Sequence, residues 1–85
     1  MGTNRTQSRF VVEIRSSNNE RLADLEVSGE MKVNELLTAL QEGFGAEVFS
    51  KPDASYLRSL YPIAFLHGSR TLSFYGLRQG SVILL

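Results

Sequence analysis

The side chains that most often carry catalysis or bind metals are scarce in this chain. Among its 85 residues there is one histidine, His67, and no cysteine. A metal site needs several His, Cys or carboxylate ligands, and a catalytic triad needs a nucleophile beside a base. Ser73 and Ser81 have no base near them in the sequence, and turn or capping roles explain both. We therefore predict no catalytic residue, no metal site and no cofactor, and we expect His67 to lie in a surface turn.

Other kinds of ligand are disfavoured as well. Gly76 and Gly80 do not form a phosphate loop, because neither a Lys-Ser/Thr pair nor a helix follows them. Nine basic residues balance nine acidic ones, which argues against DNA or RNA, since phosphate binding needs a basic surplus. No apolar stretch approaches the ~20 residues that span a bilayer. Another protein is therefore the expected partner, and the absence of cysteine fits a cytoplasmic location.

The elements that would position a binding surface begin with two strands. Residues Arg9–Arg15 and Arg21–Val27 both alternate between apolar and polar side chains, with a polar turn over 16–20 between them. This pattern predicts an antiparallel hairpin. The side chains expected to face the core are Phe10, Val12, Ile14, Ala23, Leu25 and Val27. On the other face, Glu13, Asp24 and Glu26 can pair with Arg9, Arg15 or Arg21. Residues 1–8 are expected to form a disordered tail ahead of one domain, 9–85.

After the second predicted strand, the spacing of the apolar residues changes from that of a strand to that of a helix. Apolar residues recur at helical spacing at Val33, Leu36, Leu37, Leu40 and Phe44. Gly43 and Gly45 stand where a helix is expected to stop. The pattern predicts one amphipathic helix over about 33–43. Residues 46–60 are interpreted either as a short second helix that begins near Pro52 or as an irregular crossing loop.

The last third of the chain is predicted to hold two more strands. Pro62–Leu66 forms one, His67–Arg70 a turn, and Leu72–Tyr75 a short segment that can make one helical turn. Ser81–Leu85 forms the final strand. Burying all these apolar faces at once predicts an α+β fold, a mixed sheet of four to five strands with the helix across one face. The first and last strands pair in the middle, as in the β-grasp architecture.

The segment 68–85 resembles the corresponding part of the ubiquitin superfamily. Gly68-Ser-Arg-Thr-Leu-Ser-Phe-Tyr75 is similar to ubiquitin's Gly-Arg-Thr-Leu-Ser-Asp-Tyr, with one residue inserted after the glycine. The resemblance implies that Leu72 packs in the core and that Tyr75 fastens its loop. It implies turns at Gly76 and Gly80, and a core position at Leu77.

Within that superfamily, the pattern Leu72-Ser-x-Tyr-Gly-Leu-x-x-Gly is similar to the bacterial YukD-like group. The resemblance to this group implies that the protein is a non-catalytic accessory or regulatory component of a type VII secretion system. It equally allows the ubiquitin-like domain of a larger membrane protein of such a system. The alternative resemblance is to sulfur carriers and protein modifiers. These require a C-terminal Gly-Gly, which Leu84-Leu85 does not supply and a longer native chain would have to provide.

Ubiquitin-like domains commonly bind partners through the sheet face opposite the helix. By strand parity, Val82 and Leu84 face outwards, and Val11 belongs to the same face. Pro62 leaves the parity of the third strand open, so either Ala64 and Leu66 or Ile63 and Phe65 face outwards. The candidate binding residues are Val11, Phe65, Val82 and Leu84, with Arg9, Arg15 and His67 at the rim. A partner or a second copy of the chain would cover this patch.

Overall fold

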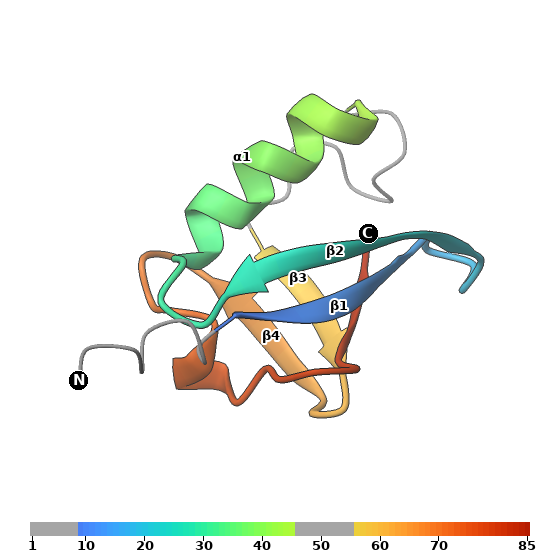
Figure 1. The fold of residues 1–85 in the computed structure, drawn as a ribbon. Coiled ribbons are helices and arrows are strands. Elements are labelled where there is room, and N and C mark those ends of the chain that lie inside the picture. The colour runs from blue at the N-terminus through green and yellow to red at the C-terminus, as the bar shows by residue number, and fades with distance from the viewer. Residues whose placement is uncertain (1–8, 46–55) are drawn as a thin grey trace.

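The computed structural model describes residues 9–45 and 56–85, and these form a helix packed on a mixed sheet (Figure 1). The sheet has five strands in the order β2-β1-β5-β3-β4. The elements are β1 (Arg9–Arg15), β2 (Arg21–Ser28), α1 (Val33–Phe44), β3 (Tyr56–Leu60), β4 (Ala64–His67), the 3₁₀ turn η3 (Ser73–Tyr75) and β5 (Val82–Leu84). The predicted tail 1–8 and the proposed helix start at Pro52 lie outside the described residues.

The first and last strands pair in the middle of the sheet, as predicted, and the structure shows that this pairing is parallel. The antiparallel β1–β2 hairpin and the α1 stripe are confirmed too, and Val12, Ile14, Val33, Leu36 and Leu40 are all buried in one core. α1 ends one residue later than predicted, and Gly45 follows it with a positive φ of 87°. Leu72, Leu77, Ile83 and Leu85 complete the core from the C-terminal segment.

The predicted strand Pro62–Leu66 is shifted along the chain: residues 61–63 form a turn, and β4 runs from Ala64 to His67, so His67 lies at the end of a strand and not in the turn that follows. A further element was also predicted wrongly. Residues 56–60, taken as part of a short helix or a loop, form strand β3 between β5 and β4. The inward side chains of β3 are Leu57 and Ser59. Buried Ser59 interrupts the apolar alternation, and its hydroxyl is satisfied by donating to the Pro62 carbonyl at 2.7 Å. Because a polar residue takes an inward position, the sequence of β3 does not show the alternation of apolar and polar residues by which a strand is predicted.

The segment after β4 caps the start of α1. The backbone N–H of Val33 donates to the Arg70 carbonyl, and that of Asn34 donates to the Gly68 carbonyl. These are first-turn donors that have no acceptor inside the helix. The Glu35 carboxylate accepts from the Lys32 backbone N–H at 3.1 Å. The turn thus fixes the position of α1 on the sheet.

Ser81 is a buried hydroxyl with two partners, and its removal should be costly. Its Oγ donates to the Tyr61 carbonyl at 2.7 Å and accepts from the Arg78 backbone N–H at 3.0 Å. We expect Ser81→Ala to lower the free energy of unfolding by about 1–3 kcal/mol, because the two backbone groups that bond to this buried hydroxyl lose their partner. Urea denaturation measures the change. Exposed Ser73→Ala is the control, expected within about 0.5 kcal/mol of wild type, and an equal effect of both variants would contradict the role of Ser81.

Candidate functional site

The strand registers align one line of side chains across the sheet face opposite α1. Arg15 is paired with Leu84, Leu84 with Arg58, and Arg58 with Phe65. Paired residues on neighbouring strands point to the same side of a sheet. Arg15, Leu84, Arg58 and Phe65 therefore form a cross-sheet row, in which cationic and apolar side chains alternate.

The structure decides the strand parity that Pro62 left open. Leu66 is completely buried, whereas the Phe65 side chain is 62% exposed. Ile63, in the turn before β4, is exposed to 83%. Of the two alternatives, Phe65 therefore faces outwards and Leu66 faces the core.

Aromatic side chains cluster at the β3–β4 end of the face. The ring of Tyr56 meets that of Phe65 edge-on, with 5.6 Å between centroids. His67 is paired with Tyr56, two positions along the strands from the Arg58–Phe65 pair and therefore on the same face, and its carbonyl accepts from the Tyr75 hydroxyl at 3.2 Å. Tyr56 orients Phe65, and His67 lies beside the end of the cross-sheet row.

Arg58 is a residue that the sequence interpretation missed, because 56–60 was not identified as a strand. It is exposed, and it makes no ion pair with any carboxylate in the described residues. An Arg guanidinium presents a planar fork of donors that suits a carboxylate. Arg58 can therefore meet an acidic side chain of a partner without first breaking an ion pair with any of the described carboxylates.

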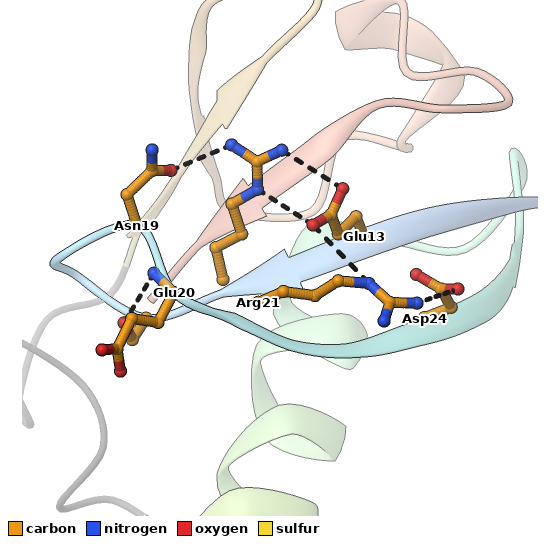
Figure 2. A network of polar contacts seen from close by, with 7 residues as sticks. Glu13, Asn19, Glu20, Arg21 and Asp24 are labelled. Atoms are coloured by element: carbon orange, nitrogen blue, oxygen red, sulfur yellow. Dashed lines mark hydrogen bonds and ion pairs between the residues drawn. The ribbon is translucent and has the colours of Figure 1, made fainter.

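Arg15, by contrast, belongs to an internal polar network. Figure 2 shows Glu13 beside the Arg21 guanidinium, with Asp24 at the far end. Glu13 accepts from Arg15 at 3.1 Å and lies 3.7 Å from Arg21, and Arg15 also donates to the Asn19 side chain at 3.0 Å. The hydrogen bond to Glu13 is the main cause that raises the pKa of the Arg15 guanidinium above its ordinary value. The predicted cross-strand pairing of charges is confirmed for Glu13 with Arg21 and for Arg9 with Glu26, whereas Arg15 pairs with Glu13 of its own strand.

Val82 cannot be the contact residue that strand parity suggested. It faces outwards, between Glu13 of β1 and Leu60 of β3, but it is only 2% exposed. β5 is an interior strand, so neighbours on both sides cover a short side chain such as valine. The longer Leu84 stays partly exposed.

Val11 and Arg9 lie on the predicted face but far from the rest of the patch. Four positions of β1 separate Val11 from Arg15, which corresponds to roughly 13 Å along a strand. Between them stand Glu13 and buried Val82. Arg9 is ion-paired with Glu26 at 3.2 Å, and the Val11 backbone N–H donates to the Gln79 side chain. The predicted patch is therefore two separate surfaces, and the exposed Phe65 belongs to the cross-sheet row.

The geometry of this face suits binding by contact. In residues 9–45 and 56–85, no three His, Asp or Glu side chains gather where they could hold a metal ion. The row instead offers a half-buried leucine and an exposed phenylalanine on either side of a guanidinium that is ion-paired with none of the described carboxylates. No helix in the part of the chain that the structure describes is long and apolar enough to cross a bilayer.

No protein-family model and no curated protein matches the chain. Among solved structures, the chain is similar to a de novo designed protein based on ubiquitin, with 23% sequence identity and a TM-score of 0.64. The match covers 91% of this chain and 85% of the designed one. The protein has a ubiquitin-like β-grasp fold. The likeness shows the fold alone, and it places the cross-sheet row on the open sheet face of that fold.

Proposed function

We propose that this protein is a non-catalytic interaction module that binds another protein through the cross-sheet row. The observation that carries the proposal is the free guanidinium of Arg58 between Leu84 and Phe65, with an ion pair to none of the described carboxylates. Apolar and aromatic anchors with a neighbouring Arg are the composition of an interface centre. The matching partner surface places an apolar side chain on Leu84 and a carboxylate opposite Arg58.

The resemblance of the Leu72–Gly80 pattern to the YukD-like group supplies the cellular context of the proposal. We place the protein in the bacterial cytoplasm, as an accessory or regulatory component of a type VII secretion system. Affinity capture with the full chain from its native host should recover a component of that system. Recovery of a partner unrelated to secretion would overturn this assignment and leave the binding face to be tested separately.

Reversing the charge of Arg58 tests the face directly. With the recovered partner purified, we expect Arg58→Glu to weaken binding about tenfold or more by titration calorimetry, because a carboxylate then faces the partner's carboxylate. The loss should shrink as salt is raised. Arg70→Glu is the matched control, since Arg70 is an exposed arginine that stacks on Phe74 at 4.4 Å, away from the row. Equal losses in both variants would contradict a specific role for Arg58.

A further inference from the structure

The two edges of the sheet differ in how they are protected against pairing with another strand. β2 forms one edge and carries Arg21, Asp24 and Glu26 along its length. Charged side chains on an edge discourage a further strand from pairing with it. β4 forms the other edge, and its sequence Ala-Phe-Leu-His contains no Lys, Arg, Asp or Glu. In the described parts of the chain no strand lies beyond β4.

The β4 edge also carries large apolar side chains that are exposed. Phe65 lies on β4 itself, exposed to 62%, and Ile63, exposed to 83%, precedes the strand. The edge-on contact with Tyr56 holds the Phe65 ring in place. An edge strand directs the backbone N–H and C=O groups of alternate residues away from the sheet, where they need a hydrogen-bonding partner. The His67 carbonyl at the end of β4 already accepts from the Tyr75 hydroxyl, so an added strand would pair with the other outward backbone groups of β4.

We propose that β4 pairs antiparallel with β4 of a second copy of this chain, forming a two-fold dimer with a continuous sheet. A strand paired antiparallel with its own copy satisfies a two-fold axis, so the same surface serves both partners. The uncharged strand and the zero net charge of the chain add no like-charge repulsion across the axis. With the axis beside Phe65, the two-fold brings the exposed Phe65 side chains of both copies together. This inference goes beyond the proposed function and does not depend on it.

The dimer is a weak and reversible one. The strand has four residues, and the exposed aromatic and aliphatic side chains beside it bury at most several hundred Å² per copy. The total falls at the low end of protein interfaces, below about 1,200 Å². We therefore expect dissociation in the micromolar range or weaker, so the dimer forms at high concentration.

Sedimentation equilibrium of the full chain alone, from about 5 μM to about 1 mM, tests the proposal over the range of weak interfaces. We expect a reversible monomer–dimer equilibrium, weakened at least about tenfold by Phe65→Lys, because lysine is a residue that blocks edge pairing. Phe74→Lys is the matched control, since Phe74 is 59% exposed but lies on η3. A chain that stays monomeric throughout the range, or a dimer that Phe65→Lys leaves intact, overturns the proposal.

Hydrogen exchange locates the interface without any substitution. Backbone amides of β4 should gain protection as concentration rises, whereas those of the charged β2 edge should not. Protection on β2 in place of β4 would overturn the proposal. Leu84→Asp should leave dimerisation unchanged, because Leu84 lies on β5 and not on the β4 edge. A loss of dimerisation can therefore be distinguished from a loss of partner binding. If β4 amides are protected only when the purified partner is added, the added strand belongs to that partner and the second copy is excluded.

Discussion

Leu84→Asp is expected to weaken partner binding at least about 30-fold, while the protein remains folded. A buried contact at the centre of an interface is worth about 2 kcal/mol or more, which corresponds to that factor. Leu84 lies between Arg15 and Arg58 in the strand registers. Its replacement removes the apolar contact and places a carboxylate that competes with the partner's carboxylate for Arg58.

The same neighbours explain why the fold should tolerate this change. A carboxylate at position 84 stands between two guanidiniums, and opposite charges on paired strands are favourable by roughly 0.2–1 kcal/mol each. The free energy of unfolding should therefore fall by less than about 2 kcal/mol, the transfer energy of one partly exposed leucine. Circular dichroism and urea denaturation measure the fold, and titration with the purified partner measures binding.

Leu22→Asp is the matched control, since it makes the same change at a leucine on the β2 edge that is 39% exposed. Normal partner binding by Leu84→Asp would show that the cross-sheet row is not the interface. Unfolding of Leu84→Asp would instead contradict the outward position of Leu84.

Leu72→Ala should strongly destabilise the protein. Leu72 is completely buried, and its backbone N–H donates to the Met31 carbonyl at 2.9 Å. Truncation of a buried leucine to alanine costs about 2–5 kcal/mol, through lost transfer energy and the cavity left behind. A domain has only about 5–15 kcal/mol of stability in total, so a large share of the protein's stability should be lost.

The loss should extend to α1. The turn that precedes Leu72 supplies the carbonyls of Gly68 and Arg70 to the first N–H groups of the helix. We expect faster hydrogen exchange at Val33 and Asn34, together with a lower urea midpoint at an unchanged slope. Phe74→Ala, at an exposed position on η3, is the control. A change below about 1 kcal/mol for Leu72→Ala would contradict its place in the core.

Much of the ubiquitin-like fold could be predicted from the sequence, because the responsible patterns are local. The period of two in β1 and β2 and the helical spacing from Val33 to Phe44 each identify an element and its apolar face. The turn glycines are equally local signals, since Gly76 and Gly80 adopt φ values of 82° and 89° that favour glycine. Where a local pattern was ambiguous, prediction failed, as in β3 with its buried Ser59.

The composition of the candidate surface was decided by the tertiary structure. Strand parity correctly directs Val82 and Leu84 outwards, but it does not reveal which neighbouring strands cover each of them. The order β2-β1-β5-β3-β4 buries Val82 and places Arg58 beside Leu84. It also leaves β4, with Phe65, at an edge. The periodicity of apolar residues shows which side of one element is apolar. The exposure of a side chain and the identity of its neighbours depend instead on the pairing of strands that are far apart in the chain, and no short segment encodes that pairing.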